Sequence, residues 1–300
     1  MEIVFLGTSS MIPTKDRNHT AIALIYKGEL MLFDCGEGTQ RQIRLARLAP
    51  SKLTKLFITH WHGDHVLGIP GLVQTLGGIN YENTLEIFGP QKTKEFINKI
   101  LNAFLCENKI NILTKDVTEG KVIETDDYQI KAIKLEHGPP TLAYSFEEKD
   151  KLRINLNYLK KFGLEKHPIL KDLQQGKNIK WNGKTIKSKD ATTIKKGKKI
   201  CIILDTGMTA QLEKKLTAFA KDADILIMET TFGEELADKA KAYGHLHVSQ
   251  AAKLAKKAKV KKLFLTHFSQ RYRDVEELKV QATKIFKNTE CAKDLLKIEL

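Results

Sequence analysis

Residues 60–65 read His-Trp-His-Gly-Asp-His, which places three histidines and an aspartate at fixed offsets. His60 and His62 are two residues apart, so on extended backbone their side chains point to the same side and can share one metal ion. Gly63 allows a sharp turn, after which Asp64 and His65 face a second ion nearby. Imidazole and carboxylate groups are the ligands that zinc takes in hydrolytic sites. The segment therefore predicts a dinuclear hydrolytic centre, and solvated histidines in a loop are the alternative.

Three further ligand candidates follow apolar runs elsewhere in the chain. His137 comes after the run 133–135, Asp205 follows the run 200–204, and His267 follows the run 263–266. Each of these residues taken alone is more often a cap or a core residue. Three of them at predicted strand ends, beside a motif as specific as residues 60–65, favour ligand roles.

The remaining histidines separate less clearly. His245 is a candidate proton donor, and Glu229, which ends a buried run, is a candidate to orient it. His19, His167 and His247 lack a ligand-like context, and we interpret them as surface or packing residues.

The elements that position these residues alternate between short β-rich runs and helices. We predict strands at residues 2–6, 21–26, 30–34, 56–59, 128–135, 199–204, 225–229 and 263–266, and helices at 39–48, 93–105, 210–220 and 249–258. Residues 56–60 recur as 263–267, and residues 32–36 resemble 203–207. This pattern fits a duplicated β/α unit with a site at its strand ends, and chance similarity between hydrophobic strands is the alternative.

The positive charge of the chain is concentrated in one segment. Residues 149–199 hold 16 Lys or Arg and 4 Asp or Glu, a net charge of +12, out of +14 for the whole chain. Such segregation is typical of a polyanionic partner, because neutralising phosphates releases condensed counterions. A lysine-rich solubility segment is the alternative. Residues 181–184 (Trp-Asn-Gly-Lys) predict a hairpin, and we interpret residues 149–199 as an arm inserted into a single domain of residues 1–300.

Length and composition set the remaining bounds. Three hundred residues with 42% apolar and 29% charged side chains are ordinary for a globular protein. Apolar runs such as 200–204 are far shorter than the ~20 residues that cross a bilayer, and residues 1–7 predict a strand rather than a signal peptide. Cys35, Cys106, Cys201 and Cys291 form no Cys-x-x-Cys pair. We therefore expect a reduced, cytoplasmic protein without a membrane segment.

The sequence at this point resembles the metallo-β-lactamase superfamily and, within it, the tRNase Z family of tRNA 3′-processing endoribonucleases. Residues 60–65 match the superfamily motif, and residues 32–40 (LFDCGEGTQ) are close to the family's first motif. Residues 13–18 (PTKDRN) match the family's PxKxRN loop, and residues 244–245 (GH) and 267–272 (HFSQRY) also look like family motifs. The basic segment stands where the family carries its tRNA-binding arm. The similarity covers essentially the whole chain.

The resemblance implies a fold and a set of ligands. The expected fold is a four-layer αββα sandwich, in which two β/α halves face each other with the metals at the strand ends between them. The implied zinc ligands are His60, His62 and His137 for one ion and Asp64, His65 and His267 for the other, with Asp205 as the bridge. Asp64 is also expected to accept a proton from the attacking water, and Glu229 and His245 align with a pair that protonates the leaving 3′ oxygen.

Some positions depart from the family pattern. Trp61 stands where a smaller aliphatic residue is usual, and residues 228–231 (METT) replace the common HEAT form but keep the glutamate. His167-Pro168 replaces Gly-Pro in the arm, and Leu246-His247 replaces a Ser-Thr pair after His245.

The function implied by the resemblance is removal of the 3′ trailer from precursor tRNA, leaving a 3′-hydroxyl on the tRNA. Two zinc ions per subunit and a homodimer, in which one subunit's arm grips the tRNA for the other's site, are expected with it. Another hydrolase with the same metal motif, such as a phosphodiesterase, lactonase or thioesterase, is the first alternative, but it explains neither the loop at 13–18 nor the basic arm. A non-catalytic RNA-binding protein is the second, but binding alone does not require seven ligand candidates.

Overall fold

The computed structural model describes residues 1–105 and 110–300, and it divides them into two compact units. The core unit consists of Met1–Ile123, Ile130–Phe146 and Lys199–Leu300, and the arm unit of Glu124–Gln129 and Glu147–Lys198. Within the described ranges no helix has both the length and the apolar character needed to cross a bilayer. Cys106 lies outside the described residues, and Cys35, Cys201 and Cys291 are buried and form no disulfide with another described residue.

The first sheet of the core unit has the strand order β18-β1-β2-β3-β4-β5-β6. Its strands are β1 (Glu2–Gly7), β2 (Ala21–Tyr26), β3 (Glu29–Phe33), β4 (Leu53–Phe57), β5 (Thr84–Gly89), β6 (Asn111–Asp116) and β18 (Lys297–Glu299). Strands β1, β2 and β3 pair antiparallel, whereas β3, β4, β5 and β6 pair parallel. The carboxyl ends of β3 and β4 therefore lie at the same edge of the sheet.

The second sheet has the order β17-β16-β15-β14-β9-β8-β7. Its strands are β7 (Gly120–Glu124), β8 (Tyr128–Glu136), β9 (Pro140–Glu148), β14 (Lys199–Ile203), β15 (Ile225–Glu229), β16 (Lys262–Thr266) and β17 (Thr289–Cys291). Strands β14 to β17 pair parallel and are almost wholly buried, as expected for parallel strands that are covered on both faces.

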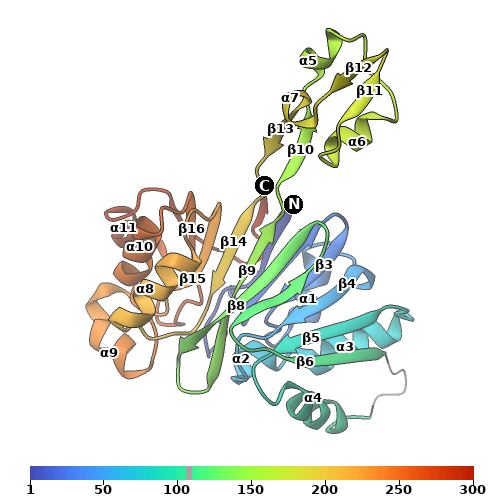
Figure 1. The fold of residues 1–300 in the computed structure, drawn as a ribbon. Helices are drawn as coiled ribbons and strands as arrows, with labels where there is room; N and C mark the ends of the chain where they lie inside the picture. Colours follow the sequence, from blue (N-terminus) through green and yellow to red (C-terminus); the bar gives the residue numbers. More distant parts are fainter. Residues whose placement is uncertain (106–109) are drawn as a thin grey trace. The chain divides into compact units, whose positions relative to one another are not determined.

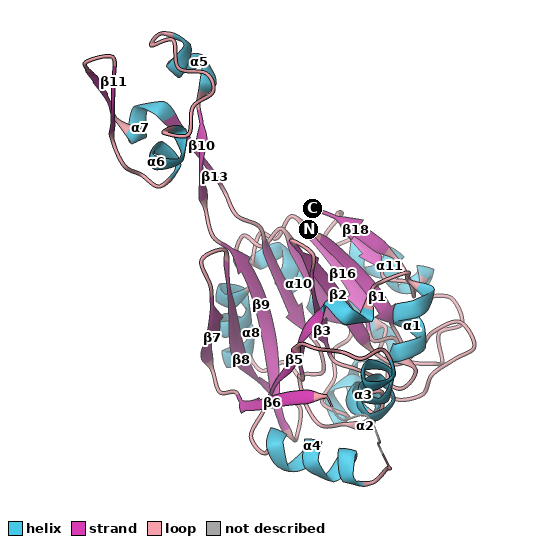
Figure 2. Cartoon of the chain, turned by 90° about the vertical axis from the view of Figure 1, so that its right-hand side faces the viewer, coloured by secondary structure: helices cyan, strands magenta, loops and turns pink. Residues whose placement is uncertain are grey.

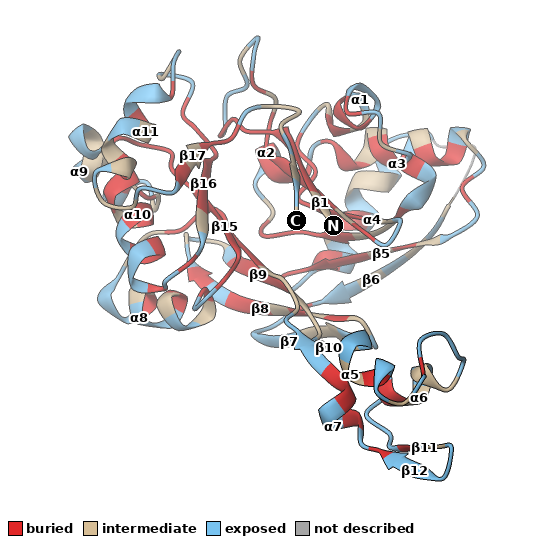
Figure 3. Cartoon of the chain, turned by 90° about the horizontal axis from the view of Figure 1, so that it is seen from above, coloured by how far each residue is buried: buried red, intermediate tan, exposed pale blue. Residues whose placement is uncertain are grey.

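Helices cover the outer face of each sheet (Figure 1). Those of the first half are α1 (Thr39–Leu45), α2 (Gly63–Val66), α3 (Ile69–Gly78) and α4 (Thr93–Asn102), with the 3-10 turn η1 (Pro50–Lys52). Those of the second half are α8 (Ala210–Phe219), α9 (Ala237–Ala242), α10 (Val248–Lys257) and α11 (Glu276–Thr283), with η2 (Glu234–Leu236). Figure 3 shows buried residues on α8 and α10 alternating with exposed ones, the pattern of helices with one face against a core.

The inner faces of the two sheets pack against each other through aromatic side chains. Tyr144 of β9 lies with its ring centroid 5.4 Å from that of Phe57 of β4, and Phe5 of β1 lies 5.6 Å from Phe264 of β16. Figure 2 shows the strands of both sheets between the flanking helices. The predicted αββα sandwich is therefore confirmed.

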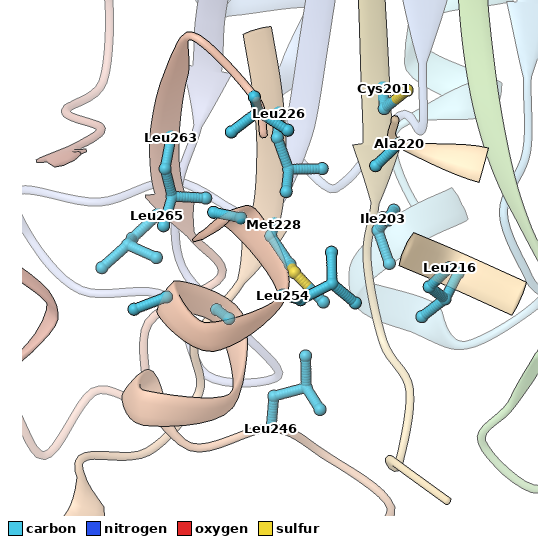
Figure 4. Packing of buried hydrophobic residues seen from close by; sticks show 14 of the residues in the cluster. Cys201, Ile203, Leu216, Ala220, Leu226, Met228, Leu246, Leu254, Leu263 and Leu265 are labelled. Carbon is cyan, nitrogen blue, oxygen red and sulfur yellow. The ribbon is translucent and has the colours of Figure 1, made fainter. Parts of the chain in front are cut away.

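A second apolar layer fixes the helices that follow the strands of the second half (Figure 4). Leu254 of α10 packs in one cluster with Leu226 and Met228 of β15, and Leu216 of α8 packs in it with Ile203 of β14. β14 ends at Ile203 and β15 ends at Glu229. The residues that follow those ends belong to the site described below.

The arm unit has its own small core. Strand β10 (Lys151–Ile154) pairs with β13 (Thr192–Lys195), and β11 (Ile179–Trp181) pairs with β12 (Lys184–Ile186). Asn182 and Gly183 both have positive φ, 47° and 74°, so the predicted hairpin is present with the turn that Asn-Gly favours. With the helices α5 (Leu156–Lys160), α6 (Leu170–Gln174) and α7 (Ser188–Ala191), the buried residues are Leu159, Leu164, Leu173, Ile179, Ile186 and Ala191.

Several predicted element boundaries were wrong, and the backbone explains two of them. The strand predicted at 30–34 ends at Phe33, because Asp34 has a φ of 58° in the left-handed region. The helix predicted at 39–48 ends at Leu45, because Arg47 has a φ of 58°. Aspartate visits this region more readily than most residues, so the chain turns at Asp34 and moves its side chain out of the strand pattern.

Candidate metal centre

The seven predicted ligands lie together, although they come from both halves of the core unit. His60 follows β4, His137 follows β8, Asp205 follows β14 and His267 follows β16, while His62 caps α2, which carries Asp64 and His65. They form two groups whose ligand atoms lie within 4.8 Å of one another: His60, His62, His137 and Asp205 in the first, and Asp64, His65, Asp205 and His267 in the second. Asp205 belongs to both groups, as expected for a bridge.

The predicted turn at Gly63 has another form. Gly63 is the first residue of α2, and His62 before it is extended, with φ −72° and ψ 150°. The chain therefore passes directly from extended backbone into a helical turn, and no left-handed residue is needed. This change of direction sends His62 toward the first group and Asp64 and His65 toward the second.

In the first group the nitrogen atoms of three imidazoles face one another. His62 Nδ1 lies 3.0 Å from His60 Nε2 and 3.2 Å from His137 Nε2. Asp205 Oδ2 lies 3.7 Å from His60 Nε2 and 3.5 Å from His137 Nε2. A proton on His62 Nδ1 can satisfy only one of the two facing nitrogens.

The second group has the same character. His65 Nε2 lies 3.2 Å from His267 Nε2, and Asp64 Oδ2 lies 3.4 Å from each of these nitrogens. Asp205 contributes both oxygens, with Oδ2 at 3.5 Å from His65 Nε2 and Oδ1 at 3.1 Å from His267 Nε2.

Asp34 orients one histidine of each group. Its Oδ2 accepts from His65 Nδ1 at 2.6 Å and from the Thr59 hydroxyl at 2.7 Å, and its Oδ1 accepts from the Thr59 N–H. Because the Thr59 hydroxyl donates to Asp34, it accepts from His60 Nδ1, 3.0 Å away. Both imidazoles thus hold a proton on Nδ1 and turn Nε2 toward the centre.

Glu229 forms a corresponding arrangement in the second half. The Thr231 hydroxyl donates to Glu229 Oε2 at 2.7 Å and therefore accepts from His267 Nδ1 at 3.0 Å. His245 Nδ1 donates to Glu229 Oε1 at 3.1 Å. The Thr206 N–H also donates to Oε1, so the buried carboxylate is fully engaged.

His137 is oriented by the backbone. Its Nδ1 donates to the carbonyl oxygen of Gly244 at 2.8 Å, which leaves Nε2 as the inward atom. Gly244 has a φ of 68°, in the left-handed region that favours glycine.

The electrostatics of the centre favour a bound cation. Burial raises the pKa of Asp205 and Asp64, but the neighbouring histidines, His267 and His65 foremost, outweigh it and hold both pKa values well below the ordinary range. Both carboxylates are therefore ionised. Asp205 Oδ1 is buried and accepts no hydrogen bond, and the nitrogen 3.1 Å from it carries a lone pair in the arrangement above. Facing lone pairs among buried carboxylates fit metal ions, and the donor set of imidazoles and carboxylates fits zinc.

The histidines respond to their surroundings in opposite directions. Burial, and after it neighbouring histidines, lower the pKa of His60 and His62 and keep these imidazoles neutral, as ligands must be. Burial also acts to lower the pKa of His65, but Asp205 and Asp34 raise it well above the ordinary value. The negative charge around His65 thus attracts a positive charge, whether a proton or a metal ion.

A cavity of about 650 Å³ opens onto the centre from solvent. His62, Asp64, His137, Asp205, His245 and His267 are among the residues that line it. Burial acts to lower the pKa of His245, but Glu229 raises it to about 9. His245 therefore meets the cavity as a protonated group.

His19 and Trp61 make packing contacts. His19 is buried, its Nε2 bonds with the Met11 carbonyl at 3.1 Å, and it lines the same cavity. Trp61 stacks on Phe96 of α4 at a centroid distance of 4.9 Å, which explains a large ring at this position.

Four residues of the centre were missed as functional positions: Asp34, Thr59, Thr231 and Gly244. Asp34 and Gly244 stand in motifs that the sequence displays, but their bonds to His65 and His137 join residues 31 and 107 positions apart. Thr59 and Thr231 carried no signal beyond their place next to a strand end.

Comparisons with known proteins agree with this geometry. Ribonuclease Z of Methanothermobacter thermautotrophicus is 40% identical over 301 residues, covering 100% of this chain and 97% of that protein. The crystal structure of human tRNase Z, short form, matches with a TM-score of 0.72 and 28% identity, covering 100% of this chain and 99% of that one. A metallo-β-lactamase fold protein of Bacillus subtilis, YhfI, matches in fold with a TM-score of 0.71 and 17% identity over 100% of this chain and 99% of its own.

One family model covers only the first half. Residues 1–154 match the model described as anti-Pycsar protein Apyc1, so this half of the chain belongs to that family as well. The matched range ends before Asp205, Glu229, His245 and His267. The full-length relative includes these positions, and the predicted family is confirmed: the chain belongs to the ribonuclease Z family, the tRNase Z enzymes of the metallo-β-lactamase fold.

Proposed function

We propose that this endoribonuclease removes the 3′ trailer from precursor tRNA with two zinc ions, one in each ligand group, and leaves a 3′-hydroxyl on the tRNA. The convergence of imidazole nitrogens on the shared carboxylate of Asp205 is the observation that carries the proposal. Bound there, zinc lowers the pKa of the attacking water and neutralises charge that builds on the phosphate oxygens.

Asp64 has the properties of the proton acceptor. It lines the cavity, and its carboxylate is ionised because its pKa lies well below the ordinary range despite burial. An ionised carboxylate at the mouth of the centre accepts the proton that the attacking water loses. Asp64→Asn keeps the shape of the side chain and removes this capacity.

Glu229 and His245 supply the proton at the other end of the reaction. The leaving group is the 3′ oxygen of the tRNA, and an alkoxide leaves poorly unless it is protonated. His245 faces the cavity with a raised pKa, and Glu229 holds its Nδ1, so the opposite ring nitrogen is free to donate.

The arm unit is the proposed tRNA-binding region. Its predicted boundaries, 149–199, enclose most of the chain's net positive charge, and lysines bind RNA mainly through phosphates. A homodimer in which the arm of one subunit holds the tRNA for the other follows from the family resemblance. A cytoplasmic site of action fits the buried thiols of Cys35 and Cys291, which form no disulfide within the described part of the chain.

The decisive experiment combines cleavage of end-labelled precursor tRNA with metal analysis of the purified protein. We expect a cut at the junction between the tRNA and its 3′ trailer, with a 3′-hydroxyl on the tRNA. We also expect about two zinc ions per chain and a dimer in sedimentation analysis. Tight tRNA binding without cleavage would identify an RNA-binding protein. Hydrolysis of small diesters, thioesters or lactones without cleavage of tRNA would identify another hydrolase.

Deletion of residues 151–195 tests the arm separately. Affinity for precursor tRNA should fall strongly and depend less on salt, because the phosphate contacts are removed. Hydrolysis of bis(4-nitrophenyl) phosphate, which needs only the centre, should continue at a near-normal rate. Unchanged tRNA affinity and salt dependence would instead identify the segment as a solubility element.

A further inference from the structure

Tyr243, at the rim of the catalytic cavity, has no role in the mechanism described so far. Its side chain lines the cavity and is 61% exposed, a high value for a large aromatic residue beside a buried polar centre. Lys239, one turn earlier on α9, also lines the cavity, and its Nζ lies 6.0 Å from the centroid of the Tyr243 ring. Together they present an aromatic face and a positive charge to whatever enters.

The position of Tyr243 is fixed from both sides. Its N–H donates to the carbonyl of Lys239 at 3.1 Å, which closes the last turn of α9. The next residue, Gly244, accepts from His137, and the one after it, His245, donates to Glu229. A single short segment thus carries an exposed ring, a support for a metal ligand and the proposed proton donor.

We infer that Tyr243 is the stacking surface for the base of the nucleotide whose 3′ oxygen leaves, which is the last nucleotide of the tRNA before the cut. The inference rests on the proposed function, because it uses His245 as the donor to that oxygen. The sugar that carries the leaving oxygen has to lie beside His245, and Tyr243, two residues earlier in the chain, lines the same cavity and offers its exposed ring to the base on that sugar. Lys239 adds a positive charge for a neighbouring phosphate.

Stacking suits this position chemically. Every base has a π-face, so an aromatic side chain accepts any base without reading its hydrogen-bonding edge. An enzyme that cuts many precursor tRNAs needs such tolerance at the cut, together with a fixed position for the leaving oxygen. An exposed tyrosine supplies both at low entropic cost.

The test pairs protein variants with modified substrates. Tyr243→Ala and Tyr243→Phe are compared on precursor tRNA that is intact, that lacks the base of the last tRNA nucleotide, or that lacks the base of the first trailer nucleotide. Because one base–aromatic stack contributes about tenfold or more, Tyr243→Ala should lower kcat/KM on intact substrate about tenfold. Removing the last tRNA base should cost the wild type about as much, and the two changes together should cost no more than either alone.

Controls separate contact from damage. Tyr243→Phe keeps the ring and should retain near-normal activity, and Phe104→Ala removes an exposed aromatic side chain that does not line the cavity. Zinc content should be unchanged in Tyr243→Ala. The inference would be overturned if the losses of kcat/KM from Tyr243→Ala and from removal of the last tRNA base multiplied, or if Tyr243→Ala were coupled to the first trailer base instead. Cleavage by the wild type would still support the proposed function. Failure of the wild type to cut precursor tRNA would remove both.

Discussion

Asp34 in the first half of the metal centre and Glu229 in the second are buried carboxylates at strand ends, and each orients two histidines. Asp34 holds His65 directly and His60 through the Thr59 hydroxyl. Glu229 holds His245 directly and His267 through the Thr231 hydroxyl. In both halves the threonine donates to the carboxylate and accepts from an imidazole, which fixes the proton on Nδ1.

The halves differ in what the directly held histidine meets. The side chain of His65 is fully buried and its Nε2 faces Asp64, Asp205 and another imidazole, so its inward atom is committed to the metal group. The side chain of His245 is 16% exposed and lines the cavity. We therefore expect the same arrangement to provide a metal ligand where the imidazole is enclosed and a proton donor where the imidazole reaches solvent.

The two halves also differ in the charge that surrounds the directly held histidine. His65 sits among carboxylates that a bound cation would balance. His245 has Glu229 as its main partner, which favours a proton on the ring. The comparison indicates that the function of a carboxylate–histidine pair depends on whether the histidine can reach the reacting atoms.

The largest effect is expected for Asp34→Asn. This change removes a charged acceptor that supports one ligand in each group, so both metal positions should weaken. Loss of a supporting group costs about 10–100-fold in metal affinity or activity for each ligand, and a combined loss of about 10³-fold in cleavage follows. Metal content by atomic spectroscopy and cleavage of labelled precursor tRNA measure it. Two ions per chain with activity within tenfold of normal would show that Asp34 is dispensable.

His245→Ala should act on the reaction and spare the metals. Without the proton donor, cleavage of precursor tRNA should fall about 10²-fold, whereas zinc content should stay the same. At saturating zinc Glu229→Gln should lower cleavage by a similar factor, and the double variant should lose less than the product of the two. The zinc affinity of Glu229→Gln should also weaken, because Glu229 supports His267 through Thr231. Bis(4-nitrophenyl) phosphate is the control substrate, because its phenolate leaves without a proton. Loss of zinc from His245→Ala would instead identify His245 as a metal ligand.

The pH dependence of cleavage sharpens the same point. Glu229 raises the pKa of His245 to about 9, against the effect of burial. The protonated donor is therefore present below that pKa, and activity is lost as pH rises through it; bound cations lower its value. Glu229→Gln removes the raising charge, so the alkaline limb of the kcat profile should move to lower pH by about one unit. A limb at the same pH in both proteins would assign it to another group.

The sequence was informative about the ligands because local patterns encode them. Hydrophobic runs that end in His60, Asp205 and His267 predict strands whose carboxyl ends deliver polar residues, and parallel pairing brings such ends to one edge. The family resemblance supplied the division into two groups, and the structure brings the same residues together. That they bind zinc stays a prediction.

What the sequence did not reveal depends on contacts between distant segments. Asp34 and Thr231 are ordinary residues at strand ends until the fold places an imidazole nitrogen against each of them. The left-handed backbone at Asp34 also broke the strand pattern that predicted residues 30–34 as extended. In the sequence Tyr243 is likewise one aromatic residue among several, and only the structure shows that it is exposed and lines the cavity.

The smallest effect is expected from the two threonines, and it distinguishes the halves. Thr59→Val leaves the Nδ1–H of His60 without its acceptor, and Thr231→Val does the same to His267. Each change should weaken metal binding by up to about tenfold, because an unsatisfied buried donor costs roughly 1–3 kcal/mol, part of which relaxation recovers.

At saturating zinc the two variants should separate. Thr59→Val should then cut precursor tRNA at a near-normal rate. The carboxylate bonded to Thr59 is that of Asp34, which orients only proposed metal ligands. Thr231→Val should remain several-fold slow, because the Glu229 oxygen that loses the hydroxyl belongs to the carboxylate that holds His245. Zinc titrations followed by single-turnover cleavage measure both quantities, and the serine variants, which keep the hydroxyl, serve as controls. Equal recovery of the two valine variants at high zinc would mean that Glu229 orients His245 without help from Thr231. Each threonine would then affect cleavage only through the binding of metal.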